Sequence, residues 1–441
     1  MSEKYTVIIG LGKTGFSCAK FCLREREPFV VVDSRENPPY AAELKAIAPN
    51  VKTVFGRLDE SLILQAAKII ISPGVSLKEL VLQKAIQQGI PCVGDIELFV
   101  ERIRAPICAI TGANAKSTVT ALVGEMAKAS GFKTQVAGNI GIPVLDLLAE
   151  PAADLYVLEL SSFQLETTFS LKAKAATILN VSEDHMDRYR NMNDYIAAKL
   201  RIYDHCETAI VNRADPRIAP VDQHIKTISF GLSPAARGYG FEKMHEEYYL
   251  TRNGQPILNV KEMKMVGRHN AENALAALAL GEALNLDQAA TLNTLRTFSG
   301  LPHRCEFVSE KEGVTFYNDS KGTNVGATIA ALEGLGQKKN IIWIAGGRGK
   351  GADFTPLRES VRAHVRCAIL LGEDAEKLSA ALKGCCSIVQ VDSMEEAVQY
   401  AKREAATGDL VLLSPACASL DMFDNYEHRG KIFTQCVLTD N

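Results

Sequence analysis

Residues 107–129 read ICAITGANAKSTVTALVGEMAKA, and this stretch decides the fold of the chain. It predicts a short apolar strand over 107–110 and a helix over 116–129. The motif over 111–118 joins the two and includes the first turn of the helix. Gly112, Lys116 and Ser117 then lie where a strand passes into a helix, as in phosphate-binding loops whose backbone N–H groups cradle phosphates. In such a loop Lys116 reaches the β/γ-phosphate oxygens and the Ser117 hydroxyl ligates Mg²⁺.

The loop departs from the common Walker pattern at two points. Its first glycine lies three residues before Ala115, instead of five residues before a Gly-Lys pair, and Ala115 stands where a glycine is usual. A Lys-Ser-Thr run at a helix start can also be simple capping. The strand–loop–helix context favours the phosphate-loop interpretation over capping.

The alternation of strands and helices continues on both sides of this loop. Short apolar runs alternate with helical stretches before residue 93, and the same rhythm follows to about residue 300. Between about 220 and 265 it weakens into hairpin-like pieces, which we interpret as a lobe on the middle domain. A third series follows the turn at 300–302. The pattern is typical of parallel sheets covered by helices.

We therefore expect an α/β fold of three domains. Residues 1–93 form a Rossmann-like domain, and residues 94–299 form a P-loop ATPase-like domain with a parallel or mixed sheet. Residues 300–441 form a second Rossmann-like domain.

The composition is that of an ordinary globular protein. Of 441 residues, 47% are hydrophobic and 23% are charged, which argues against disorder, collagen and coiled coil. Lys+Arg total 49 and Asp+Glu total 52, so the net charge of -3 lacks the basic surplus of a nucleic-acid binder. The 11 cysteines are odd in number and unpatterned, as in reduced cytoplasmic proteins. No apolar stretch is long enough for a signal peptide core or a bilayer span, so we expect a cytoplasmic protein without membrane insertion.

A second nucleotide signal lies near the N-terminus. Gly10-x-Gly12-x-x-Gly15 follows a predicted strand and opens a predicted helix, and Asp33 ends the next strand. This is the dinucleotide fingerprint, in which glycines let the backbone approach a diphosphate and the acid reaches a ribose hydroxyl. The alternative is a tight strand–helix turn that binds nothing.

Two acidic features follow the phosphate loop in the chain. Glu159 lies in an apolar strand over 155–160, where a carboxylate is costly unless a cation such as Mg²⁺ meets it. The alternative is an edge-strand Glu that faces water. Residues 161–164, Ser-Ser-Phe-Gln, form a capping box that starts a helix. The loop over 180–187 follows a strand at the carboxyl end, which suits metal or phosphate binding, with a solvated loop as the alternative.

Lys199 lies in a predicted helix over 194–205. Ile196, Leu200 and Tyr203 form its apolar stripe, and Lys199 borders the buried face. From the residues alone we interpret Lys199 as a lysine whose stem covers apolar surface while its ammonium group reaches water.

Taken together, these motifs resemble the Mur ligases, bacterial enzymes that add amino acids. The resemblance runs from residue 7 to about residue 430, and its specificity comes from the number and order of the motifs. The motifs are GLGKTG, SPG, GDIELF, TGANAKST, GNIG, LELSSFQLE, NVSEDHMDRY, AAKLRIY, HNAENALAA, GLPHRCE, NDSKGTN, GGRGKGADF and SPACASLDMF.

The resemblance implies an ATP-dependent ligase that joins D-glutamate to UDP-N-acetylmuramoyl-L-alanine through an acyl phosphate and releases ADP and phosphate. Such an enzyme serves peptidoglycan synthesis, and through it cell wall biogenesis, cell shape, cell division and the cell cycle. The resemblance implies ATP and Mg²⁺ as requirements and small molecules as the partners. It also implies a monomer in the cytoplasm, with no nucleic acid bound.

The resemblance assigns residues to each of these molecules. For the UDP-linked substrate they are Lys13, Thr14, Ser34, Arg35, Ser72, Gly74 and Asn139. For ATP they are Gly112, Ala113, Asn114, Ala115, Lys116, Ser117, Thr118, Asn273, Arg304 and Asp319. For D-glutamate they are Thr323, Lys350, Ser419 and Tyr426. For magnesium they are Ser117, Glu159, His185 and Lys199, the last as a carbamate formed with CO₂. The implied catalytic residues are Lys116, His185, Lys199 and Lys321.

Two positions depart from the family pattern. Ala115 replaces the usual loop glycine, which puts the geometry of the phosphate loop in question, and Tyr426 stands where a phenylalanine is expected.

Three alternatives remain open. The nearest is another amino-acid ligase of the same family, although no Asp-Asn-Pro-Arg stretch supports the diaminopimelate-adding relative and residues 414–423 favour glutamate. A folate-glutamylating relative does not fit the UDP-type N-terminal domain. An NAD-dependent dehydrogenase would explain residues 10–33 but would leave Lys116, Lys199 and Lys321 without roles. An inactive nucleotide-binding scaffold is suggested by Ala115.

Overall fold

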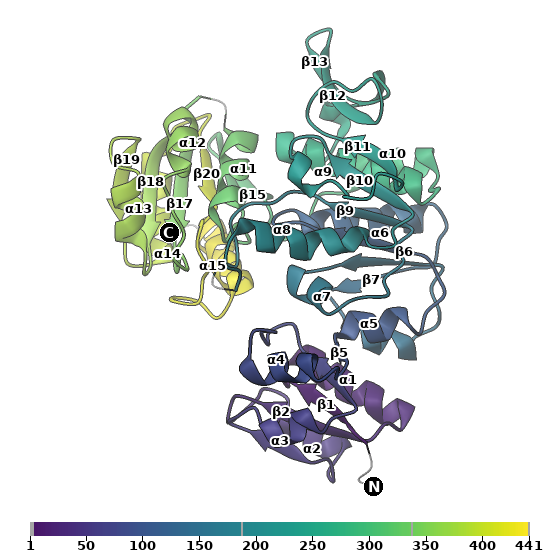
Figure 1. Cartoon of the computed structure of the whole chain (residues 1–441). Coiled ribbons are helices and arrows are strands. Elements are labelled where there is room, and N and C mark those ends of the chain that lie inside the picture. The colour runs from purple at the N-terminus through teal and green to yellow at the C-terminus, as the bar shows by residue number, and fades with distance from the viewer. Residues whose placement is uncertain (1–3, 187, 337, 440–441) are drawn as a thin grey trace.

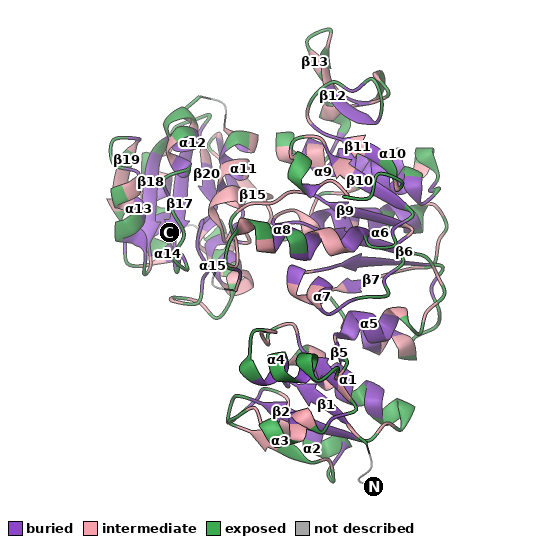
Figure 2. Ribbon diagram, viewed as in Figure 1, coloured by how far each residue is buried: buried purple, intermediate pink, exposed green. Residues whose placement is uncertain are grey.

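The computed structural model of the chain describes residues 4–186, 188–336 and 338–439. The strands form three sheets with helices packed against them (Figure 1). The strands are largely buried, whereas exposed residues gather on the outer sides of helices and in loops (Figure 2). The predicted α/β fold class is confirmed. The sheets fall within the three predicted domains, whose exact boundaries stay a prediction.

The N-terminal sheet is parallel throughout and has the strand order β3-β2-β1-β4-β5. Its strands are β1 Thr6–Ile9, β2 Phe29–Asp33, β3 Thr53–Phe55, β4 Lys68–Ile71 and β5 Cys92–Val93. Its helices are α1 Lys13–Glu25, α2 Ala41–Ile47, α3 Glu60–Leu64 and α4 Leu80–Gln87. Ile8 packs in one core cluster, whereas Val7 and Ile9 pack in another on the opposite face. Burial on both faces explains why these strands are almost continuously apolar.

Helix α5, Asp95–Val100, joins the N-terminal sheet to the central sheet. Phe99 belongs to the same buried cluster as Ile8 and as Leu158 of the central sheet. The Glu97 carboxylate accepts hydrogen bonds from the backbone N–H groups of Phe169 and Ser170, at 2.7 and 2.9 Å. The connection between the two sheets is therefore a packed joint rather than a loose linker.

The central sheet has the strand order β14-β13-β12-β11-β10-β9-β6-β8-β7. Its strands are β6 Ile107–Thr111, β7 Thr134–Gly138, β8 Leu155–Glu159, β9 Ala175–Ile178, β10 Thr208–Asn212, β11 Lys226–Phe230, β12 Tyr239–Met244, β13 Glu247–Arg252 and β14 Gln255–Asn259. Its α-helices are α6 Lys116–Ala129, α7 Ser162–Glu166, α8 Met192–Leu200, α9 Arg268–Ala283 and α10 Gln288–Thr297. Its 3₁₀ helices are η1 Val144–Ala149, η2 Arg201–Tyr203, η3 Pro216–Ile218 and η4 Val260–Glu262.

The hairpin-like stretch interpreted as a lobe on the middle domain continues the central sheet at its β11 edge. Strand β12 pairs with β11 in parallel at a single position, and β12, β13 and β14 then pair antiparallel. Figure 1 shows β12 and β13 projecting from the end of the central domain.

The C-terminal sheet has the strand order β15-β16-β20-β17-β18-β19, and only its edge strand β15 is antiparallel. Its strands are β15 Glu306–Lys311, β16 Val314–Asn318, β17 Ile341–Gly346, β18 Val365–Leu371, β19 Ser387–Gln390 and β20 Leu410–Leu413. Its helices are α11 Val325–Leu335, α12 Leu357–His364, α13 Ala375–Ala381, α14 Met394–Glu404 and α15 Tyr426–Leu438. Within the described part of the chain, no helix is long and apolar enough to cross a bilayer.

Candidate active site

Three cavities with shared lining residues lie where the domains meet. The central cavity, of about 280 Å³, is lined by residues that include Asn114, Ala115, Thr118, Asn273, Arg304 and Asp319. The N-terminal cavity, of about 850 Å³, is lined by residues that include Lys13, Arg35, Ser72, Gly74 and Asn139. The C-terminal cavity, of about 340 Å³, is lined by residues that include His185, Thr323 and Lys350. Lys321 lines both the central and the N-terminal cavities, and Ser182 and Gly326 line both the central and the C-terminal cavities.

The phosphate loop has the predicted strand–loop–helix form, with α6 beginning at Lys116. Ala115 adopts a left-handed conformation with φ 64°, and it provides no side-chain cap to α6. The Lys116 ammonium donates to the carbonyl oxygens of Gly112 and Ala113, both at 2.9 Å. Burial lowers the pKa of Lys116. The lysine thus lies folded over its own loop, where an incoming phosphate would compete with the two carbonyls for the ammonium group.

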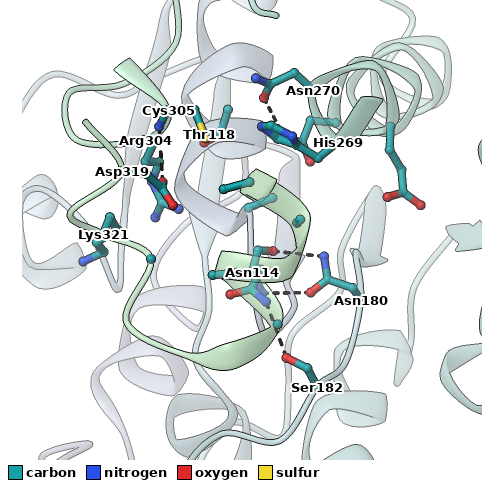
Figure 3. A pocket seen from close by; sticks show the side chains of 18 of the residues that line it. Asn114, Thr118, Asn180, Ser182, His269, Asn270, Arg304, Cys305, Asp319 and Lys321 are labelled. Atoms are coloured by element: carbon teal, nitrogen blue, oxygen red, sulfur yellow. Dashed lines mark hydrogen bonds between the residues drawn. The ribbon is translucent and has the colours of Figure 1, made fainter. Parts of the chain in front are cut away.

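The Ser117 hydroxyl is held by a residue from the other side of the cavity. Arg304 Nη2 donates to Ser117 Oγ at 2.8 Å, although the two residues are far apart in the chain. Of the remaining residues predicted for ATP, Asn114, Ala115, Thr118, Asn273, Arg304 and Asp319 line the central cavity (Figure 3).

Glu159 lies at the end of β8, which pairs with β6 on one side and β7 on the other. It is 1% exposed, so the alternative of an edge-strand Glu facing water is wrong. Its Oε1 accepts a hydrogen bond from Asn139 Nδ2 at 2.8 Å, whereas Oε2 is buried without a partner. An orphaned carboxylate oxygen at the carboxyl end of a parallel strand fits a hard cation such as Mg²⁺.

Lys199 is 1% exposed, and the interpretation that its ammonium reaches water is wrong. Its Nζ donates to the Gly112 carbonyl oxygen at 2.9 Å and to Thr111 Oγ1 at 3.4 Å. It also lies 4.5 Å from the centroid of the Tyr195 ring. Burial, together with the neighbouring Lys116 charge, holds the pKa of Lys199 well below its ordinary value. The helix turns the lysine inward, under the phosphate loop.

The loop after β9 contacts the phosphate loop through paired amides. Asn180 Oδ1 accepts from the backbone N–H of Asn114 at 2.8 Å, and its Nδ2 donates to the Asn114 carbonyl at 3.3 Å (Figure 3). Asp187, the last residue of the predicted acidic loop, lies outside the described residues.

His185 packs its ring against Phe163, with the ring centroids 4.9 Å apart. Burial lowers the pKa of His185, and the positive charges of Lys350, Lys116 and Lys199 lower it further, against the effect of Asp184. A neutral imidazole at the C-terminal cavity can accept a proton.

A group that sequence patterns alone did not single out connects the C-terminal domain to the phosphate loop. Asn324 caps α11, and its Nδ2 donates to Asn114 Oδ1 at 3.1 Å and to Asp184 Oδ2 at 3.4 Å. Its capping role is visible in the sequence, because Asn is a preferred N-cap residue. Its partners lie in another domain and leave no local signal.

Asp319 and Lys321 lie on one loop beside the central cavity (Figure 3). Asp319 accepts from Ser414 Oγ at 2.7 Å and from the backbone N–H of Cys305 at 3.2 Å, and burial raises its pKa to about 6. The Lys321 ammonium lies 3.5 Å from the centroid of the Tyr426 ring. Burial, followed by the charge of Arg304, lowers the pKa of Lys321 to about 8.

The structure brings together the whole set predicted for the UDP-linked substrate. All of its members line the N-terminal cavity: Lys13, Thr14, Ser34, Arg35, Ser72, Gly74 and Asn139. The glycine fingerprint has a packing role too, since a Cβ on Gly15 would lie 1.8 Å from the Gly10 carbonyl oxygen.

The predicted role of Asp33, by contrast, does not fit the geometry. Its carboxylate is 2% exposed and accepts from the backbone N–H of Leu11 at 2.6 Å. Arg35 donates to it from Nε and Nη2, at 2.9 and 2.7 Å. Asp33 lines the N-terminal cavity, but both of its carboxylate oxygens already accept hydrogen bonds from Leu11 and Arg35.

The set predicted for D-glutamate is divided. Thr323 and Lys350 line the C-terminal cavity, whereas Tyr426 lines the N-terminal cavity. Ser419 is 3% exposed and lines neither.

The predicted magnesium set contains only two side chains of the usual metal-binding types, Glu159 and His185. Across residues 4–186, 188–336 and 338–439, no group of at least three His, Cys, Asp or Glu side chains could hold a metal ion. Mg²⁺ needs no such group, because it binds through one or two carboxylates together with water and substrate phosphates.

Three family models match the chain along its length. The Mur ligase MurD-like N-terminal domain matches residues 4–94, the Mur ligase middle domain matches residues 110–281, and the Mur ligase glutamate ligase domain matches residues 303–417. The chain belongs to the Mur ligase family.

Curated Mur ligases similar to this chain include two named UDP-N-acetylmuramoylalanine–D-glutamate ligase. The protein of Coxiella burnetii (strain RSA 331 / Henzerling II) is 51% identical, and the alignment covers 99% of each chain. That of Pseudomonas savastanoi pv. phaseolicola is 48% identical, over 99% of this chain and 98% of the relative.

Solved structures of other Mur ligases share the fold. UDP-N-acetylmuramate-alanine ligase from Thermotoga maritima superposes with a TM-score of 0.60 at 18% identity, covering 98% of both chains. A pseudomurein peptide ligase from Methanothermus fervidus gives a TM-score of 0.59 at 19% identity, over 93% of this chain and 96% of that one.

Proposed function

We propose that this Mur ligase joins D-glutamate to UDP-N-acetylmuramoyl-L-alanine at the expense of ATP, releasing ADP and phosphate. The observation that carries the proposal is the sharing of lining residues between the three cavities. The central cavity borders the N-terminal cavity at Lys321 and the C-terminal cavity at Ser182 and Gly326. Three substrates that react in sequence need such adjoining sites. The full-length identity of 51% to a D-glutamate ligase supports the choice of amino acid.

We assign one substrate to each cavity and to one predicted domain. The UDP-linked substrate occupies the N-terminal cavity of domain 1–93, ATP the central cavity of domain 94–299, and D-glutamate the C-terminal cavity of domain 300–441. Lys350 and Thr323 then suit a carboxylate of D-glutamate, through charge-assisted and neutral hydrogen bonds.

The reaction we propose has two steps. An oxygen of the L-alanine carboxylate attacks the γ-phosphorus of ATP, ADP leaves, and an acyl phosphate forms. The amine nitrogen of D-glutamate then attacks the carbonyl carbon, the bond to phosphate breaks, and the amine loses a proton. Neutral His185, beside Lys350 in the C-terminal cavity, is the proposed acceptor of that proton.

The cationic side chains around the central cavity serve the first step. A carboxylate and a triphosphate repel one another, and Lys116, Arg304 and Lys321 supply positive charge where they meet. When bound, Mg²⁺ neutralises phosphate charge, and the orphaned Oε2 of Glu159 is the oxygen that fits it.

We further propose that Lys199 carries a carbamate. A neutral lysine amine adds to CO₂, an N–C bond forms, and one proton leaves to solvent. Burial supports this step because it favours the neutral amine. The carbamate supplies anionic oxygens, the ligand type that Mg²⁺ prefers.

We infer that the enzyme acts in the cytoplasm as a monomer. Its described cysteines are all free, as expected of a reducing compartment, and its substrates are small molecules. Sedimentation at working concentrations tests the monomer, since a dimer would double the mass.

Phosphate release from ATP tests the function. With UDP-N-acetylmuramoyl-L-alanine present, we expect D-glutamate to stimulate release, and L-glutamate and L-alanine to leave it near background. Equal stimulation by neutral amino acids would refute the D-glutamate assignment. No turnover with any amino acid would favour the inactive scaffold, and a fluorescence change with NADH would favour the dehydrogenase.

A further inference from the structure

One arginine connects the wall of the N-terminal cavity to the loop that carries His185. Arg188 Nη1 donates to the Gly74 carbonyl oxygen at 3.0 Å, and its Nη2 donates to the Val75 carbonyl oxygen at 3.3 Å. Lys78, just beyond this turn, donates its ammonium group to the Arg188 carbonyl oxygen in return. Each of the two domains therefore donates hydrogen bonds to the other at this contact.

The turn that Arg188 binds is hydrogen-bonded into the wall of the N-terminal cavity. Residues 72–75 line that cavity, and the Val75 N–H donates to the Ser72 carbonyl at 2.9 Å. Ser72 Oγ in turn donates to the Gly10 carbonyl at 2.8 Å, in the glycine-rich loop that starts α1. A shift of the cavity wall is thus passed to the carbonyl oxygens that Arg188 binds.

At its other end Arg188 is fastened to His185. The backbone N–H groups of Arg188 and Tyr189 both donate to the His185 carbonyl oxygen, at 2.9 and 3.2 Å. The Arg188 guanidinium lies 4.3 Å from the centroid of the Phe163 ring, against which the His185 ring also packs. Backbone and ring contacts therefore fix His185 relative to Arg188.

The bonding of the guanidinium argues against an ordinary surface ion pair. Burial raises the pKa of the Glu166 carboxyl, which the charge of Arg188 lowers, but among the described residues no ion pair within 4.0 Å involves Arg188. Its two terminal nitrogens instead point at neighbouring carbonyl oxygens of a single turn, which the planar fork of arginine matches and a lysine does not.

We propose that Arg188 is a positioning residue that couples occupancy of the N-terminal cavity to the placement of His185. The inference rests on the proposed function of the two cavities and adds a link between them. A UDP-linked substrate that orders the turn at 72–75 orders Arg188, and Arg188 sets the loop from which His185 meets the amine. Arg188 itself touches no reacting atom.

Kinetics of four proteins test the coupling: the wild type, Arg188→Ala, Arg188→Lys and Arg190→Ala. Arg190 is the matched control, because it lies on the same loop, is largely exposed and, among the described residues, forms an ion pair with Asp194 alone, at 3.3 Å. We expect kcat for phosphate release to fall roughly 10- to 100-fold in Arg188→Ala, as a misplaced catalytic group predicts. Arg188→Lys keeps the positive charge but loses the planar guanidinium, so its kcat should lie between those of the wild type and Arg188→Ala. The kcat of Arg190→Ala should stay within about twofold of the wild-type value.

Binding of UDP alone, measured by calorimetry, separates positioning from damage to the cavity. Because a coupling free energy is reciprocal, UDP affinity should change in Arg188→Ala, but by much less than kcat, and all variants should remain folded up to temperatures near the wild-type thermal midpoint. An Arg188→Ala variant with the kcat of Arg190→Ala would overturn the proposal, and so would a kcat loss matched by an equal loss of UDP affinity or by unfolding.

Hydrogen exchange keeps the test independent of turnover. On addition of UDP, amides in residues 182–186 and 188–190 should exchange more slowly in the wild type and should not respond in Arg188→Ala. A wild type that shows this response but releases no phosphate would refute the proposed function and keep the coupling. Equal responses in both proteins would refute the coupling.

Discussion

The Lys199 ammonium nitrogen lies 2.9 Å from the carbonyl oxygen of Gly112, so helix α8 is fastened directly beneath the phosphate loop. A buried amine at this position has a depressed pKa and is available as a neutral nucleophile toward CO₂. A carbamate nitrogen would keep one hydrogen, so the proposed modification is compatible with the hydrogen bond to Gly112.

Replacement of Lys199 should therefore remove activity without removing the fold. Lys199→Ala should lose most ligation, roughly 100-fold or more in kcat, and added acetate should restore part of it by supplying a carboxylate. Phosphate release with and without acetate measures both effects, and Lys174→Ala, in a partly exposed pair with Glu207, is the control. A fully active Lys199→Ala, or a magnesium-bound crystal structure with a free Lys199 amine, would contradict the carbamate.

Glu159→Gln should separate stability from activity. The Oε2 atom of Glu159 is buried without a partner, and an amide in its place is cheaper to bury than a charge. The thermal midpoint should therefore stay unchanged or rise, while the magnesium-dependent kcat falls roughly 100-fold, the scale of losing one stabilising group. The exposed variant Glu125→Gln serves as the control. Wild-type kcat and magnesium dependence in Glu159→Gln would exclude Glu159 as a ligand.

Ala115→Gly should tighten nucleotide binding or leave it unchanged. Ala115 holds φ 64°, a left-handed conformation that costs a non-glycine residue on the order of 1 kcal/mol. Glycine adopts this conformation readily and keeps the same N–H. Calorimetric titration with ADP measures the difference, and a substantially weaker affinity in the variant would show that Ala115 is not strained.

Lys321 should make nucleotide affinity depend on pH. Its pKa of about 8 means that the protonated, phosphate-binding form is present below that pH and is lost as the pH rises through it. ADP affinity should therefore fall between about pH 7 and pH 9.5 in the wild type but hold in Lys321→Arg, because arginine remains charged. Lys128→Arg, at an exposed pair with Glu125, should behave as the wild type. Identical pH profiles for the wild type and Lys321→Arg would assign the titration to another group.

Gly334→Ala should loosen the contact between the central and C-terminal domains. A Cβ on Gly334 of α11 would lie 2.2 Å from the buried Nδ1 atom of the His269 ring on α9. Overpacking of this kind costs about 1–3 kcal/mol, so the thermal midpoint should fall and phosphate release should slow. Removing the ring in the double variant Gly334→Ala/His269→Ala should recover part of the loss. If the changes in thermal midpoint of Gly334→Ala and His269→Ala simply add in the double variant, the two residues do not interact.

Local pattern accounts for much of the fold. The helix predicted over 116–129 is α6 with the same bounds, and the capping box of Ser161 with Gln164 forms as predicted. Both depend on neighbouring residues only, through apolar periodicity and side chains that cap the first turn. Short edge strands such as β3 and β19 carry too few residues to show a pattern, and the helix predicted to reach residue 205 ends as α8 at Leu200, followed by a 3₁₀ turn.

What the sequence determined by itself, then, is the order of strands and helices, the phosphate loop and, through its ordered motifs, the family. Tertiary structure decided which side chains are free to act. It buried Lys199 against Gly112, engaged Asp33 with the backbone N–H of Leu11, and placed Lys321 between two cavities. These outcomes depend on partners distant in the chain or on the three-dimensional course of a loop. Periodicity and motif spacing carry information about residues that are close in the sequence. The contacts named here form only when distant segments pack against one another, so no local pattern predicts them.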